Sequence, residues 1–514
     1  MNGAESLVRT LLKSGVDVCF TNPGTSEMHF VVALDQVPGM RSVLVLFEGV
    51  ASGAADGYYR MAGRPASTLL HLGPGLGNAL ANLHNAKKAG SGVVNIVGEH
   101  AIAHIALDAP LTSDIEGIAR PVSGWVHTSR AATDIGADGA RAVAAASIAP
   151  GQVATLILPG DTAWNEGGLV AEPLPVPTRK PVSGAAIDAA AAALGGPDSL
   201  LLLGGAALNE DCLLLAGRIA DATGCELLTE WSNARLERGA GVVSVKRIPY
   251  PVDQALEMLA PYRRIALVGA RPPVAFFAYP DKPGVLTRPG AEFVDLADSA
   301  ADIKGTLEGL AAAVGAGSDT PSRVARPHRP AVPEGPATPE TIACVLGALI
   351  PEGAIIVDES VTTGRAFFAE TAGAPRHSWL NNRGGSIGYG LPVAIGAAIA
   401  CADRKVIALE GDGSAMYTVQ SLWTMAREKL DITILVFANR SYRILHGELA
   451  NVGAANPGPR AIDMLTLNRP VLDWVDLARG MGVEGCRVSD TGDLARAMET
   501  GLATDGPYLV EIEL

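Results

Sequence analysis

Short apolar runs rich in β-branched residues alternate along the chain with longer alanine- and leucine-rich segments of helical period. Runs this short are typical of buried strands, and the longer segments between them are typical of helices. Strands that alternate with helices pair in parallel, because each helix carries the chain back across the sheet. The pattern therefore predicts an α/β fold built from doubly wound parallel sheets. The predicted strands are residues 16–20, 42–47, 67–71, 93–97, 153–158, 200–203, 227–229, 265–268, 293–296, 355–357, 406–409, 432–437 and 508–513.

Two segments rich in proline and polar residues interrupt this alternation, at residues 174–183 and 317–340. Such a composition resists both helix and sheet and is typical of linkers between domains. We therefore expect three domains, at residues 1–173, 184–316 and 341–514. The length of 514 residues suits three domains, each large enough for a core of its own.

The composition supports a folded α/β protein. Hydrophobic residues make up 48% of the chain and charged residues 18%, which excludes a chain that is disordered throughout. The 59 glycines exceed the roughly 36 expected from average usage, and they follow no Gly-X-Y period. This surplus suits tight turns after parallel strands and a backbone that folds closely around a ligand.

Net charge and cysteine usage indicate which classes of binding partner and which cellular compartment to expect. The formal net charge is −14, and basic residues cluster only in a proline-rich linker, so we expect neither nucleic acid nor an anionic membrane as a partner. No apolar run is long enough to span a membrane. The six cysteines are scattered without a C-x-x-C pair, which favours a reducing compartment, and we expect the protein in the cytoplasm.

The strongest chemical motif is Gly411-Asp412-Gly413, followed one predicted strand later by Asn439. In a parallel sheet both loops open at the same carboxyl edge, where ligands bind. Asp412 and Asn439 would supply two oxygen ligands to a hard cation such as Mg²⁺, and the two glycines would let backbone N–H groups approach a phosphate. Asp-Gly alone often marks only a turn, but a strand before each part of the motif favours a metal site.

Residues 411–442 resemble the diphosphate-binding motif of the thiamine diphosphate (ThDP) enzymes. The resemblance implies a Mg²⁺ ion held by Asp412, by Asn439 and by the backbone carbonyl of Ser441. Ala438 and Arg440 depart from the common family pattern, but neither stands at a ligand position. The resemblance also assigns four residues of this stretch to cofactor binding, namely Gly411, Gly413, Ser414 and Tyr442.

Four more segments carry the same resemblance. Residues 20–25 resemble the family's loop after the first strand, residues 47–58 its catalytic-glutamate helix, residues 71–78 the glycine-rich turn that follows, and residues 381–392 the stretch under the cofactor's thiazolium ring. The resemblance covers nearly the whole chain, as pyrimidine-binding, middle and diphosphate-binding domains in that order. Within the family, the sequence is most similar to the acetolactate synthase and benzoylformate decarboxylase branch, especially to acetolactate synthase large subunit-like proteins.

Glu48 falls at the catalytic glutamate of this family's helix. In the family, that carboxylate pairs with N1′ of the cofactor's aminopyrimidine, so that the 4′ nitrogen can remove the proton from C2. A buried carboxylate is costly without such a partner. If the metal motif were absent, Glu48 would be interpreted as an acid that offsets a helix dipole.

Other residues are assigned to the cofactor by the same resemblance. Ile387 is the expected wedge that bends ThDP, and an ordinary core aliphatic is the alternative. Thr362 and Thr363 could hydrogen-bond the diphosphate, although helix capping accounts for them equally well. The remaining cofactor positions are Asn22, Pro23, Gly24, Gly75, Asn78, Gly385 and Ser386.

Five positions are expected at the substrate pocket. His71 aligns with an active-site histidine of the benzoylformate decarboxylase branch and is expected to be catalytic, and Thr25 lies where that branch has a substrate-binding serine. The second histidine of the branch is missing, and Phe277 aligns with it, which leaves that branch's proton relay incomplete. Ile444 and Glu448, in the helix after the metal motif, could shape the pocket or be ordinary helix residues.

The resemblance implies ThDP- and Mg²⁺-dependent decarboxylation of a 2-oxo acid. We expect carboligation to a second carbonyl, as in acetolactate synthases, because few acids are expected in the pocket. The alternatives are a decarboxylase that releases an aldehyde, as benzoylformate decarboxylase does, and a catalytically degenerate ThDP-binding subunit.

Two further expectations concern the fold class and the assembly. Nicotinamide or flavin chemistry on a Rossmann fold is disfavoured, because residues 73–77 lack the G-x-G-x-x-G spacing. FAD could still be bound in the middle domain, although no motif supports it. The family implies a homodimer or homotetramer whose active sites lie between subunits.

Overall fold

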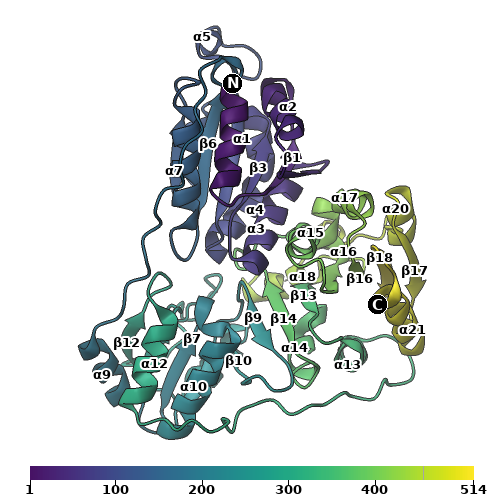
Figure 1. Cartoon of the computed structure of the whole chain (residues 1–514). Helices are drawn as coiled ribbons and strands as arrows, with labels where there is room; N and C mark the ends of the chain where they lie inside the picture. The colour runs from purple at the N-terminus through teal and green to yellow at the C-terminus, as the bar shows by residue number, and fades with distance from the viewer. Residues whose placement is uncertain (455) are drawn as a thin grey trace.

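The computed structural model describes residues 1–454 and 456–514 and arranges them around three β-sheets (Figure 1). The first sheet has six parallel strands in the order β2-β1-β3-β4-β6-β5. Its strands are β1 (Val18–Asn22), β2 (Arg41–Leu44), β3 (Ala66–Leu70), β4 (Val93–Glu99), β5 (Trp125–Thr128) and β6 (Val153–Pro159).

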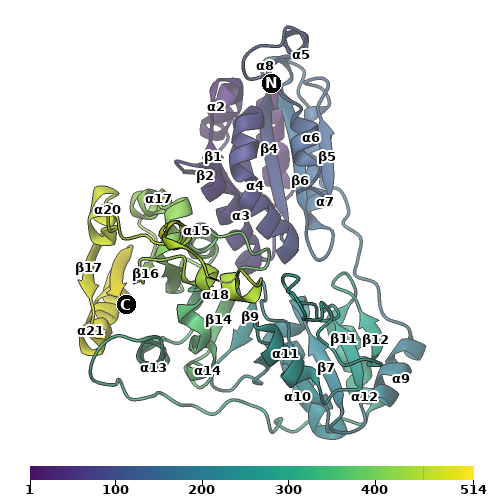
Figure 2. The same cartoon turned by 180° about the vertical axis from the view of Figure 1, so that it is seen from behind.

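Helices cover both faces of this first sheet (Figure 2). α1 (Gly3–Lys13) packs beside α7 (Ile135–Ser147) on one face, and α3 (Glu48–Ala62) packs beside α4 (Leu72–Ala89) on the other. Successive residues of β4 enter the two cores alternately, as expected for a strand buried on both faces. The other helical elements are η1 (Thr25–Glu27), α2 (Met28–Gln36), α5 (Ile102–Ile105), α6 (Ile115–Ala119) and α8 (Gly160–Trp164).

The second sheet has five parallel strands in the order β10-β8-β7-β11-β12. They are β7 (Ser199–Leu203), β8 (Glu226–Thr229), β10 (Lys246–Arg247), β11 (Arg264–Val268) and β12 (Glu292–Ala297). The helical elements around this sheet are α9 (Gly184–Ala193), η2 (Gly205–Leu208), α10 (Glu210–Thr223), α11 (Val252–Leu259) and α12 (Ile303–Ala313).

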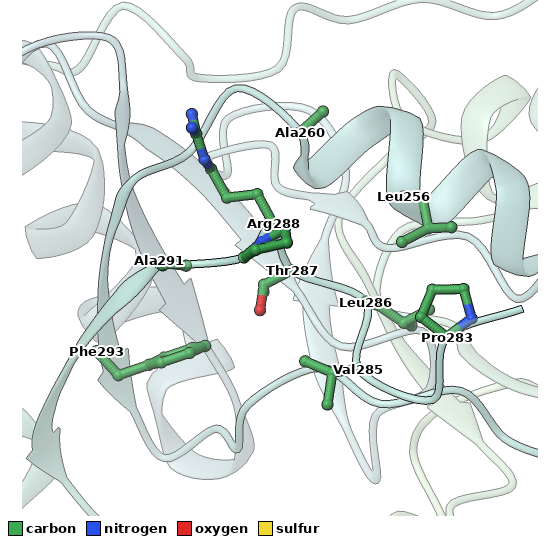
Figure 3. Close-up of a pocket in the computed structure, with 11 residues that line it drawn as sticks. Leu256, Ala260, Pro283, Val285, Leu286, Thr287, Arg288, Ala291 and Phe293 are labelled. Atoms are coloured by element: carbon green, nitrogen blue, oxygen red, sulfur yellow. The ribbon is translucent and has the colours of Figure 1, made fainter.

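A cavity of about 570 Å³ lies beside this second sheet, between α11 and the segment 283–293 (Figure 3). Leu256 of α11, Val285, Leu286 and Phe293 give it a largely apolar wall. None of the residues predicted for the cofactor or the substrate lines it. This cavity is therefore not the site that the sequence predicts for the cofactor and the substrate.

The third sheet has seven strands in the order β17-β18-β16-β15-β13-β14-β9. Its strands are β9 (Leu236–Arg238), β13 (Ile355–Glu359), β14 (His377–Asn381), β15 (Val406–Gly411), β16 (Ile432–Ala438), β17 (Glu484–Val488) and β18 (Tyr508–Glu513). The helical elements are α13 (Pro339–Leu349), η3 (Thr363–Arg365), α14 (Phe367–Glu370), α15 (Gly390–Ala400), α16 (Asp412–Ala415), η4 (Met416–Thr418), α17 (Ser421–Glu428), α18 (Arg443–Asn451), α19 (Pro459–Asp463), α20 (Trp474–Gly480) and α21 (Thr491–Ala503).

The predicted α/β class with parallel sheets is confirmed, with one antiparallel exception. β9 comes from the middle of the chain but pairs antiparallel with β14, at the edge of the third sheet. Sequence patterns predicted neither of these strands, nor β5, β10 and β17. β9 and β10 are only three and two residues long, and β17 alternates polar and apolar residues at an edge, so the apolar signal is weak. In the described part of the chain, no helix combines the length and apolar character needed to cross a membrane.

The first and third sheets are joined where α3 crosses α15 (Figure 1). A Cβ on Gly57 of α3 would collide with the Val393 carbonyl, and a Cβ on Gly396 of α15 would collide with the Ala54 carbonyl. Glycine is required at both positions, because the two backbones touch. Part of the glycine surplus therefore serves helix packing, and the contact fixes α3, which begins at Glu48, against the third domain.

Candidate active site

The carboxyl ends of β1 and β3 bring the first group of predicted residues together. Glu48 is the first residue of α3 and only 8% exposed. The side-chain amide of Asn78, on α4, donates a hydrogen bond of 3.0 Å to Glu48 Oε2. A Cβ on Gly75 would lie 3.1 Å from Glu48 Oε1 and 3.4 Å from the Cβ of His71. Glu48, His71, Gly75 and Asn78, which the sequence assigns to catalysis and cofactor binding, therefore lie in one cluster.

Glu27 joins this cluster and was not predicted from the sequence. Its Oε2 lies 2.8 Å from Nδ1 of His71 and accepts a 2.7 Å hydrogen bond from the Gly24 N–H. The other oxygen, Oε1, is buried without a hydrogen-bond partner among the described residues. Burial raises the pKa of Glu27, although the bonds from Gly24 and His71 oppose the shift. Nε2 of His71 has no hydrogen-bond partner in the described ranges, so this ring nitrogen is free to contact a ligand.

The second group lies at the carboxyl ends of β15 and β16, which are neighbouring parallel strands. Asp412 begins α16 and is 3% exposed, and its two oxygens accept backbone N–H bonds from Arg440 (2.7 Å) and Gly413 (2.9 Å). Burial raises the pKa of Asp412 to about 6, against these two hydrogen bonds. Asn439 Oδ1 accepts from the Ser441 N–H at 3.0 Å. The predicted metal residues are thus adjacent.

This donor set suits a hard cation. Carboxylate, amide and carbonyl oxygens are the ligands that Mg²⁺ takes in proteins, usually with oxygens from a bound phosphate or water. Within residues 1–454 and 456–514, no three His, Cys, Asp or Glu side chains gather as a metal cluster. A site here would therefore rest on one carboxylate, one amide and a backbone carbonyl. Its positive charge would also offset the burial of Asp412.

Arg440, which departs from the family pattern, has a strained backbone conformation. Arg440 has φ +56, in the left-handed region where glycine is favoured. Its guanidinium pairs with Glu513 at the end of β18, at 2.5 Å. The backbone at Arg440 still donates to Asp412, so the loop keeps the arrangement that the predicted ligands need.

The segment with Ile387 contacts elements that carry both groups, since Gly384 lies against α4 and Gly388 lies against η4, which follows α16. Gly385 and Gly388 both have positive φ, at +81 and +86, which lets the chain turn sharply on each side of Ile387. The buried carboxylate of Glu359, at the end of β13, accepts hydrogen bonds from the N–H groups of residues 388, 389 and 390 at 2.8–3.3 Å. Burial raises the pKa of Glu359 to about 7, against these bonds. Glu359 was not predicted from the sequence.

Thr362 and Thr363 lie beside a second, smaller cavity of about 370 Å³, together with Arg365, Arg443 and Ile444. Thr362 precedes η3, but its side chain makes no capping hydrogen bond. The capping alternative is therefore not realised for Thr362, and its hydroxyl can serve a ligand. Other residues predicted for the diphosphate gather at the start of α16, where Gly411 and Ser414 are adjacent and Gly413 lies against Tyr442.

The substrate-pocket residues are divided between two places. Phe277 is 52% exposed and packs edge-on against Phe276, whose ring tip would lie 2.5 Å from a Cβ on Gly385. Glu448 of α18 accepts a 2.9 Å hydrogen bond from Tyr279. Phe276, which was not predicted, thus lies closer to the Ile387 segment than Phe277 does. Ile444 lies instead at the cavity of Thr362.

Three predicted residues remain near the end of β1. Asn22 is the last residue of β1, and Asn22 and Pro23 are half-buried, while Thr25 is exposed at the start of η1. The ring of His71 occupies the space that a Cβ on Gly24 would need. Glycine is therefore required at this turn for His71 to reach Glu27.

Comparison with known families agrees with this geometry. The family model "Thiamine pyrophosphate enzyme, N-terminal TPP binding domain" matches residues 1–118, and the model "Thiamine pyrophosphate enzyme, C-terminal TPP binding domain" matches residues 363–512. The first match contains Glu48 and His71, and the second contains Ile387, Asp412 and Asn439.

Individual proteins resemble the chain over its full length. A "Putative acetolactate synthase large subunit IlvX" of Mycobacterium tuberculosis is 50% identical, covering 100% of this chain and 99% of that protein. A benzoylformate decarboxylase of Pseudomonas aeruginosa is 31% identical over 98% of this chain and 97% of that protein. The ThDP-dependent 4-hydroxybenzoylformate decarboxylase of Rhodococcus jostii RHA1 has a TM-score of 0.86 at 26% identity, over 100% and 99% of the two chains. The chain therefore belongs to the thiamine pyrophosphate enzymes, in the branch of acetolactate synthases and benzoylformate decarboxylases.

Proposed function

We propose that this chain catalyses ThDP- and Mg²⁺-dependent decarboxylation of a 2-oxo acid and that it releases an aldehyde. Bound ThDP supplies a nucleophilic carbon and an electron sink for the bond that breaks as CO₂ leaves. The observation that carries the proposal is the cluster of Glu48, Asn78, Glu27 and His71 on the first domain. In this cluster Glu48 would be the carboxylate that pairs with the cofactor, and His71 would be the acid that protonates the product fragment.

Glu48 would hold a proton at N1′ of the aminopyrimidine. Its position at the start of α3 excludes most water, and Asn78 orients the carboxylate by donating to Oε2. On the third domain, Asp412, Asn439 and the Ser441 carbonyl would hold Mg²⁺, and the N–H groups at the start of α16 would bind phosphate oxygens. These two groups have separate tasks, one in proton transfer and one in binding.

His71 would decide the fate of the product fragment. Its Nδ1 lies 2.8 Å from Oε2 of buried Glu27, and this contact orients the ring. Nε2 can then deliver a proton to carbon, so that an aldehyde leaves. Carboligation is the second candidate, because the relative that is 50% identical carries the name of an acetolactate synthase subunit. A water-poor pocket without an active proton donor would favour it.

Product analysis tests this proposal. The purified protein is incubated with pyruvate or phenylglyoxylate, with and without ThDP and Mg²⁺, and the products are identified by mass spectrometry. We expect aldehyde from wild type only when both cofactors are present. His71→Ala should lower aldehyde release about 10²-fold, with less effect on substrate consumption when a second carbonyl acceptor is added. Hydroxyketone as the main wild-type product would establish carboligation instead.

We further propose a homodimer with active sites between subunits. Tyr417 is 54% exposed beside Gly388, and Phe276 is 40% exposed beside Gly385, so two aromatic rings flank the Ile387 segment. A ligand and a second copy of the chain would cover them. Sedimentation analysis should show a dimer or tetramer, and a fully active monomer would contradict this part of the proposal.

A further inference from the structure

Two buried asparagines on α4 connect the first domain to the segment that carries Ile387. Asn82 is 2% exposed and Asn85 is fully buried. Asn82 lies one helical turn after Asn78, whose amide contacts Glu48, and Asn85 lies three residues further along α4. Buried amides on the apolar side of a helix are costly unless each of their polar atoms finds a partner.

Asn82 joins two backbones that are far apart in the sequence. Its Nδ2 donates to the carbonyl of Gly49, in the first turn of α3, at 2.9 Å. The same nitrogen donates to the carbonyl of Gly388 at 3.1 Å. Because both partners are carbonyls, only the amide nitrogen fits between them. The Asn82 side chain thus links the backbone of Gly49, next to Glu48, to the backbone of Gly388, next to Ile387.

Asn85 binds the backbone on the other side of Ile387, at Ser386. Its Nδ2 donates to the Ser386 carbonyl at 2.8 Å, and its Oδ1 accepts from the Ser386 N–H at 3.2 Å. This two-point contact is the pattern by which a neighbouring strand holds a backbone residue. Asn85 also donates to Oδ1 of Asn82 at 3.0 Å, so the two amides form one connected network.

We propose that Asn82 and Asn85 are positioning residues that fix the backbone on both sides of Ile387 and thereby hold this side chain where it shapes bound ThDP. The inference rests on the proposed function, since Ile387 has this task only when ThDP is bound. The contacts are made to main-chain atoms of Ser386 and Gly388. They therefore set the place of the backbone itself, whatever side chains the segment carries.

A plain packing role for the two amides predicts a different outcome. Loss of packing would lower the melting temperature and leave the folded, loaded enzyme with its normal rate. Loss of positioning would slow the chemistry of the loaded enzyme, because a displacement of about 1 Å at a catalytic centre can cost on the order of 10²-fold. The two roles can thus be separated by the rate at which the C2 hydrogen of bound ThDP exchanges with solvent, because this step needs no substrate.

The test uses the full-length variants Asn85→Asp, Asn85→Ala and Asn82→Ala. Asn95→Asp is the matched control, because Asn95 is equally buried in the first sheet, and among the described residues its side chain bonds Thr68 and Thr155 and not the Ile387 segment. Four kinds of measurement are made. They are the Kd for ThDP with Mg²⁺ by fluorescence quenching, the rate at which the C2 hydrogen of bound ThDP exchanges for deuterium by quenched NMR, kcat and KM for the 2-oxo acid by steady-state kinetics, and the melting temperature.

In the Asn82 and Asn85 variants we expect exchange and kcat to fall together by about 10–100-fold, with the KM and the Kd for ThDP changed by less than about 5-fold. Asn95→Asp should lower the melting temperature without slowing exchange. If Asn85→Asp does not fold, the alanine variants decide. Unchanged exchange in the folded variants, or an equal loss in Asn95→Asp, would overturn the inference. Failure of wild type to bind ThDP would instead overturn the proposed function.

Discussion

The residues predicted for the cofactor are held by different physical means in the first and third domains. On the first domain they are held by other side chains, since Glu48 is paired with Asn78, and His71 with Glu27. On the third domain, the backbone dominates, since the oxygens of Asp412 are bound to main-chain N–H groups. Side chains can change protonation and drive chemistry, whereas fixed N–H groups and a metal provide binding. Activity and affinity should therefore separate when the two domains are altered in turn.

The largest effect is expected from Glu48→Gln. Glutamine keeps the shape and the contact with Asn78 but cannot hold the proton as a carboxylate does. We expect kcat to fall by about 10²–10⁴-fold, with the Kd for ThDP nearly unchanged, as measured by steady-state kinetics and fluorescence titration. Glu428→Gln, which removes an ion pair with Arg41 outside the site, is the control. A large loss of ThDP affinity in Glu48→Gln would break the comparison between the domains.

Asp412→Asn should show the opposite pattern. Loss of the charge weakens the hold on Mg²⁺, so we expect the Kd for ThDP in the presence of Mg²⁺ to rise by about 10–100-fold, while a large excess of both recovers much of the rate. Binding is measured with Mg²⁺ and again after EDTA treatment. Asp431→Asn is the control, because Asp431 pairs with Lys405 at the opposite end of the sheet. Affinity that still responds to Mg²⁺ as in wild type would count against Asp412 as a ligand.

A smaller, pH-dependent effect is expected at Glu359. Burial raises its pKa to about 7 in the folded chain, above the ordinary value of 4.5, so the folded state binds a proton that the unfolded state lacks between these pH values. Stability from this group is therefore greatest at low pH and falls as the pH rises from about 4.5 to about 7. The melting temperature of the cofactor-free wild type, relative to Glu359→Gln, should decrease over this window. A difference that does not vary with pH would contradict the burial argument.

Sequence patterns predicted the fold class and the parts of the site that have local signals. Asp412, Asn439 and Glu48 each follow a predicted strand, and glycines flank Asp412 and follow Glu48, so the short stretch around each residue carries a signal. Most predicted strands differ from the structure by one to three residues at an end. Phe47, predicted as the last residue of a strand, instead precedes α3 as its N-terminal cap.

The remaining site residues depend on partners far along the chain. The role of Glu27 depends on its contact with His71, and the role of Asn85 on its contact with Ser386. Both contacts join residues far apart in the sequence, so no local pattern shows them. One signal was present for the asparagines. Asn82 and Asn85 are three residues apart on a helix face that also carries Leu83 and Ala86 in the core, and polar residues on such a face require a partner.

The pairing of β9 with β14 has a consequence for synthesis of the chain. Arg238 pairs with His377, which leaves the ribosome about 140 residues later, a delay of roughly 7–30 s at ordinary rates of translation. The second sheet can form during this time, but β9 remains without its neighbour. A fragment that ends before β14 would expose this strand, so expression of the middle region by itself should favour association between copies.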